Sequence, residues 1–152
     1  MVPLTDNLVN ARMSIDALTA SGSTYIPAGL QWGWRALDAS VPFSSQASDE
    51  RNKLLILMTD GQNTKSQDGT LHTAFDRQAA NALTLDLCDQ IKRSDIKVAT
   101  VSYSRGGGGA DTGMLETCAS SENLFYNARN AASLRTAFES AINQANNIRL
   151  IR

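Results

Sequence analysis

Residues 53–64 read KLLILMTDGQNT. Five consecutive apolar residues, 54–58, lead directly into the polar segment 59–63, and this pattern predicts a buried strand that ends in a turn. An apolar run without alternation is typical of a strand covered on both faces, as in parallel sheets with helices above and below. Ligands of such sheets bind beyond the carboxyl ends of the strands, which is where Asp60 would lie.

The rest of the chain alternates helical and extended patterns. Apart from the strand at 54–58, we expect strands at 96–103 and 124–126. We expect helices at about 8–18, 27–37, 75–93, 114–119 and 131–146. The first helix would be capped by Thr5 or Asp6, and its apolar residues Leu8, Ala11, Ile15 and Leu18 would lie on one face of it. This order predicts an α/β fold, a doubly wound and mostly parallel sheet with helices on both faces.

Length and composition limit the classes of function. The 152 residues, 42% of them apolar, are enough for one domain with a core of its own. A net charge of −1, with basic residues scattered along the chain, offers no electrostatic footprint for nucleic acid. No apolar run approaches the roughly 18 residues of a membrane span, and residues 1–10 lack the pattern of a signal peptide.

Two motifs carry a family resemblance. Residues 22–30 read GSTYIPAGL, and LMTDG follows at 57–61. The pair G-x-T-x-I-x-x-G-L and L-x-T-D-G, at this separation, resembles a von Willebrand factor type A domain, which has a Rossmann-like fold. The segments TYIPAGLQWGWRAL, LCDQIK, LETCAS and FYNARNAASLRTAFESAI further resemble the type A domain of TadG-like proteins, which belong to bacterial tight-adherence (Flp) pilus-assembly systems.

This resemblance implies a non-catalytic protein-binding or assembly domain. Its partners would be other pilus-assembly or cell-envelope proteins. Its location would be periplasmic or exposed at the cell envelope, in a parent protein anchored in the inner membrane. The resemblance covers nearly the whole chain but only the C-terminal part of the family's domain, so residues 1–152 are expected to form a single, incomplete type A domain.

The family's metal-ion-dependent adhesion site combines a D-x-S-x-S motif with a threonine and an aspartate from two later loops. Thr24 and Asp60 match the last two, but D-x-S-x-S is absent, and residues 38–42 (DASVP) come nearest to it. The N-terminal strands of the fold are therefore expected to be missing. Mg²⁺, or Ca²⁺ or Mn²⁺, would bind only if that segment were supplied, because two residues cannot provide about six oxygens. The alternative is that Thr24 and Asp60 only hydrogen-bond their own loops.

In the family's sheet, the missing first strand lies beside the strand that ends at Asp60. Its absence leaves residues 54–58 with an unpaired apolar edge, which must be covered to avoid aggregation. We expect another strand to fill the gap. The candidates are residues 1–5, the tail IRLIR at 148–152, and a second copy of the chain, which would make a homo-oligomer.

Cysteine and tryptophan residues add further candidates. Cys88 and Cys118 fall on successive helices that two right-handed crossovers place side by side, so they form either a disulfide or two buried thiols. Trp32 and Trp34 must point to different sides of their helix. We expect one in the core and the other facing a partner.

An enzyme remains the alternative from another functional class. It would be a Mg²⁺-dependent hydrolase on a doubly wound sheet, using Asp60 or Asp68. Neither a nucleophile motif nor a pair of carboxylates accompanies these residues. We therefore expect a binding domain and not an enzyme.

Overall fold

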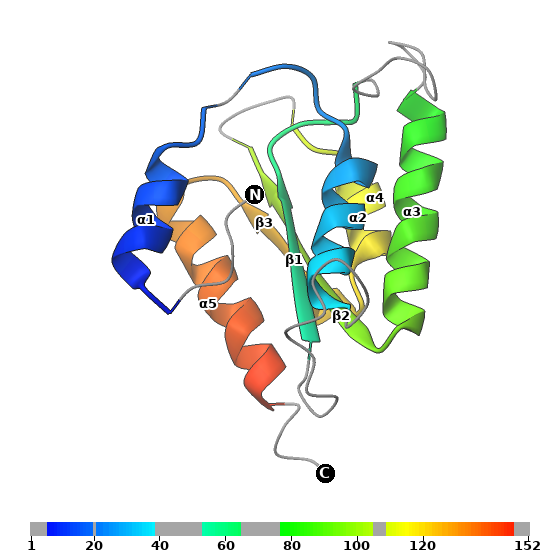
Figure 1. Cartoon of the computed structure of the whole chain (residues 1–152). Coiled ribbons are helices and arrows are strands. Elements are labelled where there is room, and N and C mark those ends of the chain that lie inside the picture. Colours follow the sequence, from blue (N-terminus) through cyan, green and yellow to red (C-terminus); the bar gives the residue numbers. More distant parts are fainter. Residues whose placement is uncertain (1–5, 20, 39–52, 65–76, 105–108, 148–152) are drawn as a thin grey trace.

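The computed structural model describes residues 6–19, 21–38, 53–64, 77–104 and 109–147. These residues form a three-stranded sheet with helices on both faces (Figure 1). The strands are β1 (Lys53–Thr59), β2 (Ile96–Tyr103) and β3 (Phe125–Ala128). The helices are α1 (Leu8–Asp16), α2 (Ile26–Leu37), α3 (Arg77–Arg93), α4 (Thr112–Cys118) and α5 (Ala131–Asn147), with a 3-10 turn at Glu122–Leu124.

The sheet is parallel and has the order β1-β2-β3. Leu55 lies beside Val98, and Val101 lies beside Tyr126. The predicted α/β class with a parallel sheet is confirmed. Within the described residues, β1 pairs only with β2, so its other edge has no neighbouring strand.

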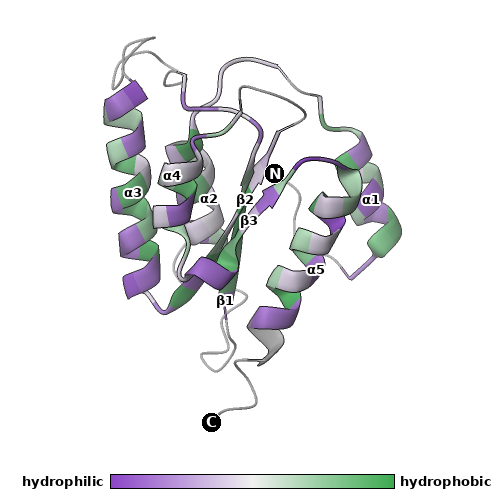
Figure 2. Ribbon diagram, turned by 180° about the vertical axis from the view of Figure 1, so that it is seen from behind, coloured by the Kyte–Doolittle hydropathy of each residue, from purple (hydrophilic) through white to green (hydrophobic). Residues whose placement is uncertain are grey.

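The two faces of the sheet are covered unequally. Helices α2, α3 and α4 lie on one face, and α5 crosses all three strands on the other. Figures 1 and 2 place α1 on the same side of the sheet as α5. One face is thus closed by three helices and the other mainly by one.

The larger part of the core lies under α2, α3 and α4. Its fully buried members include Leu30, Ile91, Val98 and Leu115. On the α5 side, the buried contacts are mostly small residues. Ala137 and Ala141 let α5 approach Ala99 and Val101 closely, because alanine leaves little side chain between a helix and a strand.

Most predicted elements are confirmed to within a few residues, but the cap of helix α1 differs from the predicted one. Its N-cap is Asn7, whose Oδ1 accepts hydrogen bonds from the backbone N–H groups of Val9 and Asn10, each at 3.1 Å. Thr5 lies outside the described residues. None of the residues of α1 is buried, and Leu8 and Ile15 are 81% and 65% exposed.

Two further predictions need correction. Strand β1 is not fully covered on both faces, since only Leu55 and Thr59 are buried and Met58 is 42% exposed. Its position at an open edge is the physical reason. The last strand begins at Phe125 instead of Leu124, because Leu124 closes the 3-10 turn.

A short turn connects α3 to β2. Asp95 has a φ of 59°, the left-handed conformation that ends a helix, and it lets the chain reverse directly from α3 into β2. No helix of the described residues is long and apolar enough to cross a membrane.

Candidate functional site

The loop before α2 and the loop after β1 are joined at the carboxyl end of β1. The backbone N–H of Thr64 donates to the carbonyl of Thr24 at 2.9 Å, and the N–H of Thr24 donates to the Thr64 hydroxyl at 2.9 Å. The Thr64 hydroxyl also donates to the Thr24 carbonyl at 3.2 Å. Residues 40 positions apart are therefore held together by three hydrogen bonds.

This junction brings Thr24 next to the turn that carries Asp60. A Cβ built on Gly61 would lie 3.6 Å from Thr24 Oγ1, so the threonine hydroxyl faces the residue after Asp60. The Thr59 hydroxyl shapes the turn, because it donates to the Gly61 carbonyl at 3.0 Å and accepts from the Gly61 N–H at 3.2 Å. Asp60 itself is exposed.

The buried side chain of Asn63 holds the same loop in place. Asn63 is fully buried, and its Oδ1 accepts from the backbone N–H of Ile26, the first residue of α2, at 2.8 Å. Its Nδ2 donates to Asn81 Oδ1 at 2.9 Å and lies 3.2 Å from Thr84 Oγ1, both on α3. One side chain thus links the Asp60 loop to two helices.

The network continues from α3 to α4. Asn81 Nδ2 donates to Asp111 Oδ2 at 2.9 Å, and Asp111 Oδ1 accepts from the backbone N–H of Met114 at 3.0 Å. Asp111 is the N-cap of α4. Neither Asn63 nor Asp111 was predicted from the sequence. For Asp111 the available signal was its position three residues before Met114, the spacing of a helix cap, whereas Asn63 had no local signal.

The described residues do not by themselves make a metal site. Thr24 and Asp60 offer one hydroxyl and one carboxylate, whereas Mg²⁺ and Ca²⁺ take about six oxygens or more. Among the described residues, no group of three or more His, Cys, Asp or Glu could hold an ion. The structure therefore places the hydroxyl of Thr24 beside the turn that carries Asp60, at the carboxyl end of β1.

Cys88 and Cys118 form a disulfide between α3 and α4, with their Cα atoms 5.3 Å apart. Both residues are completely buried in the larger core cluster. Lys92 joins the same two helices, because its Nζ donates to the carbonyl of Thr117 at 3.2 Å and pairs with Asp89 at 2.9 Å. The pair lowers the pKa of Asp89, through the hydrogen bond from Lys92 and then through its charge.

The two tryptophans of α2 have different environments. Trp34 packs against the larger core cluster, and its Nε1 is buried with no hydrogen-bond partner in the described part of the chain. Trp32 is 47% exposed, and the guanidinium of Arg35 lies 5.4 Å from its ring centroid. Their different orientations were expected from their spacing.

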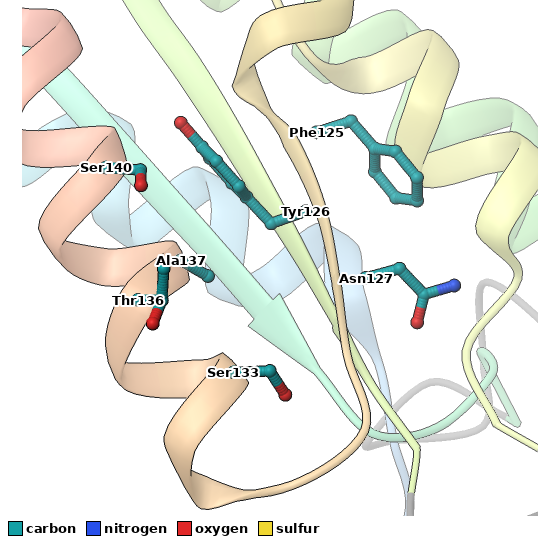
Figure 3. Close-up of a pocket in the computed structure, with 7 residues that line it drawn as sticks. All are labelled: Phe125, Tyr126, Asn127, Ser133, Thr136, Ala137 and Ser140. Atoms are coloured by element: carbon teal, nitrogen blue, oxygen red, sulfur yellow. The ribbon is translucent and has the colours of Figure 1, made fainter.

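An open groove of about 350 Å³ lies between β3 and α5, away from the Asp60 loop. Figure 3 shows Tyr126 pointing from β3 toward α5, whereas Phe125 and Asn127 point to the other side of the strand. Three hydroxyl residues of α5, Ser133, Thr136 and Ser140, line its opposite wall. Asp68, the alternative catalytic candidate, lies outside the described residues.

Comparison with solved structures identifies the architecture. Proximal thread matrix protein 1 from the mussel byssus, in a structure with a zinc-occupied MIDAS motif, aligns over 90% of this chain with a TM-score of 0.59 and 22% identity. The pilus adhesin SpaC from Lactobacillus rhamnosus GG aligns over 95% of the chain with a TM-score of 0.64 and 18% identity. The chain has a von Willebrand type A-like fold.

The similarity covers only part of these proteins. The chain spans 28% of the matrix protein and 21% of the adhesin. No protein-family model and no curated protein matches the sequence. At these identities the comparison establishes the type A-like fold of the chain and its structural relation to a matrix protein and an adhesin.

Proposed function

We propose that this chain is the C-terminal part of a type A domain that binds protein partners during pilus or cell-envelope assembly, as the resemblance to TadG-like proteins implies. One observation carries the proposal: Thr24 and the Asp60 turn are held together at the carboxyl end of β1. Ligands of parallel α/β sheets bind at this end. The fold shared with an adhesin and a matrix protein supports binding over catalysis.

Thr24 and Asp60 are proposed as two ligands of a divalent cation, Mg²⁺, Mn²⁺ or Ca²⁺. The remaining oxygens would come from a D-x-S-x-S segment, from water and from the bound partner. Binding of the protein partner would then require the cation.

The test is titration of the chain with Mn²⁺, alone and with a synthetic strand containing D-x-S-x-S. We expect the strand to raise the Mn²⁺ affinity by about tenfold or more, which is at least 1.4 kcal/mol. Asp60→Ala and Thr24→Ala should abolish the gain. Asp86→Ala removes an exposed carboxylate from α3 and should leave it unchanged. An affinity gain that survives Asp60→Ala would contradict the proposed ligand set.

The Cys88–Cys118 disulfide supports a location outside the cytosol, because reducing systems keep cytosolic thiols free. We therefore propose the periplasm or the envelope surface. Trp32 is the proposed partner-contact residue of α2, since aromatic side chains with large exposed faces are enriched at interfaces. Trp34 contributes to the core instead.

A further inference from the structure

The hydroxyl of Thr64 contacts the backbone of Thr24 at two points. It accepts a hydrogen bond from the Thr24 N–H at 2.9 Å and donates one to the Thr24 carbonyl at 3.2 Å. The backbone N–H of Thr64 donates to the same carbonyl at 2.9 Å. Both backbone polar groups of Thr24 are therefore held by one residue of the Asp60 loop.

The side chain of Thr24 takes no part in this contact. In the described part of the chain, no hydrogen bond joins its hydroxyl to another residue, and none joins the exposed carboxylate of Asp60. The backbone of Thr24 is thus fixed while its side-chain oxygen stays available to a ligand.

Thr59 holds the Asp60 turn in the same way. Its hydroxyl accepts from the Gly61 N–H at 3.2 Å and donates to the Gly61 carbonyl at 3.0 Å. In each loop, one threonine hydroxyl spans the N–H and the carbonyl of a single residue. In both loops, the hydroxyl that fixes the backbone is a different group from the proposed ligand oxygen.

Holding both backbone groups of a residue fixes the direction of its side chain. The two planar peptide groups that meet at a Cα atom set the direction of the Cα–Cβ bond. Only the χ1 rotation then remains, and the branched Cβ of threonine restricts it. The contacts of Thr64 therefore determine where the Thr24 hydroxyl lies, which is beside Gly61, at 3.6 Å from a Cβ built there.

We propose that Thr64 is a positioning residue of the cation site: its hydroxyl directs Thr24 Oγ1 toward the ion and does not bind the ion itself. This inference rests on the proposed function, in which Thr24 and Asp60 are ligands. Divalent cations accept oxygens only within a narrow range of distances, about 2.0–2.6 Å, so a misdirected hydroxyl weakens binding. Thr64 is exposed, so its hydroxyl contributes little to stability, because water can replace the hydrogen bonds that it makes.

Thr64→Val tests the role of this hydroxyl, because valine has nearly the shape of threonine. Two contacts still join the loops in the variant, from the residue 64 N–H to the Thr24 carbonyl and from the Ile26 N–H to Asn63 Oδ1. We therefore expect the variant to fold. Thr64→Ser keeps the hydroxyl and should behave as the unmodified chain does.

Thr136→Val is the matched control. Thr136 is exposed on α5, and its hydroxyl donates to the Ala132 carbonyl at 3.2 Å, so the same atoms change far from the Asp60 loop. In urea denaturation, Thr64→Val should lose no more stability than Thr136→Val does.

Mn²⁺ titration in the presence of the synthetic D-x-S-x-S strand measures the effect on the site. We expect the Mn²⁺ affinity of Thr64→Val to fall by roughly fivefold, the effect of losing about one hydrogen bond. Thr64→Ser and Thr136→Val should keep the affinity of the unmodified chain. A loss of affinity without a matching loss of stability separates positioning from a merely structural role.

Amide hydrogen exchange of Thr24, followed by NMR in EDTA, provides a readout that needs no cation. We expect the Thr24 amide to exchange roughly fivefold faster in Thr64→Val, because it loses its acceptor, and at the original rate in Thr64→Ser. An unchanged rate in Thr64→Val would mean that the hydroxyl does not hold Thr24, and would overturn the inference.

The inference and the proposed function fail in different ways. If the strand gives the unmodified chain no gain in Mn²⁺ affinity, both are wrong. If the unmodified chain and Thr64→Val gain equally, only the inference is overturned. An equal loss of affinity in Thr64→Ser and Thr64→Val would also overturn it, since the hydroxyl would then not be the group that matters.

Discussion

Asn63 Nδ2 donates a hydrogen bond of 2.9 Å to Asn81 Oδ1, and this contact ties the Asp60 loop to α3. Replacing Asn63 with leucine would leave the Ile26 N–H without its acceptor and Asn81 without its donor. Buried polar groups that lose their partners cost about 1–3 kcal/mol each. We expect Asn63→Leu to lower the free energy of unfolding by about 2–4 kcal/mol in urea denaturation.

Asn127→Leu is the control for this substitution, because Asn127 is exposed on β3. It should change stability by less than about 0.5 kcal/mol. Equal effects of the two leucine substitutions would show that the Asn63 network contributes nothing specific.

The Cys88–Cys118 disulfide closes a loop with a sequence separation of 30. By loop-closure entropy, a cross-link of this length stabilises the folded state by about 3.5 kcal/mol. We expect the double variant Cys88→Ala with Cys118→Ala to unfold at a correspondingly lower urea concentration. Reductant should destabilise the unmodified protein and have no effect on the variant. An unmodified protein that is insensitive to reductant would mean that the cysteines are not paired.

Two glycines of α2 form a matched pair for testing how α2 packs on β1. A Cβ at Gly29 would meet no atom within 4 Å, whereas a Cβ at Gly33 would lie 3.0 Å from Leu55 Cδ1. Replacing a helical glycine with alanine is worth up to about 1 kcal/mol when nothing opposes it. Gly29→Ala should therefore raise the melting temperature.

Gly33→Ala should raise the melting temperature much less than Gly29→Ala, or not at all, because Leu55 must shift to accommodate the new methyl group. A melting temperature raised equally by both substitutions would show that α2 and β1 are not packed as closely as the structure indicates.

Tyr126 gives the protein a sensitivity to alkaline pH. Burial raises the pKa of its phenol above the ordinary value of 10.0. The folded state therefore favours the neutral phenol. The stabilisation is fully present below the pKa of the unfolded chain and is lost as the pH rises through the pKa of the folded state.

Tyr126→Phe should reduce the loss of stability above pH 10, as followed by urea denaturation between pH 8 and 11. At neutral pH we expect the variant to be as stable as the parent or more stable, because the Tyr126 hydroxyl is buried without a hydrogen-bond partner in the described residues. A clear loss of stability at pH 7 would indicate that the hydroxyl does have a partner.

Much of the fold could be predicted because local signals agreed with the tertiary structure. The apolar run in β1, the β-branched residues of β2 and the proline near the start of α2 each specify an element directly. The alternation of these elements then implied a parallel sheet. Helix α1 was correctly predicted as a helix, but its exposure could not be predicted, because amphipathic spacing does not reveal whether a sheet lies underneath.

The candidate site was predictable only in part. Thr24 and Asp60 were found through a motif, whereas Thr64 and Asn63, which hold their loops together, belong to no pattern with a local signature. Asn63 becomes recognisable only when the chain brings α2 and α3 to it. From the sequence alone, polar residues in a loop are predicted to be solvent-exposed, because their buried hydrogen-bond partners are not yet known.

The covalent ring between Cys88 and Cys118 encloses the whole of β2, the central strand. When the chain is pulled from its two ends, this ring cannot open. The disulfide therefore keeps a segment with a sequence separation of 30, which would be roughly 100 Å long when fully extended, from being stretched. Only the residues outside this ring can be extended while the disulfide is intact. A reductant would release the stored length, visible as a longer final step in single-molecule extension.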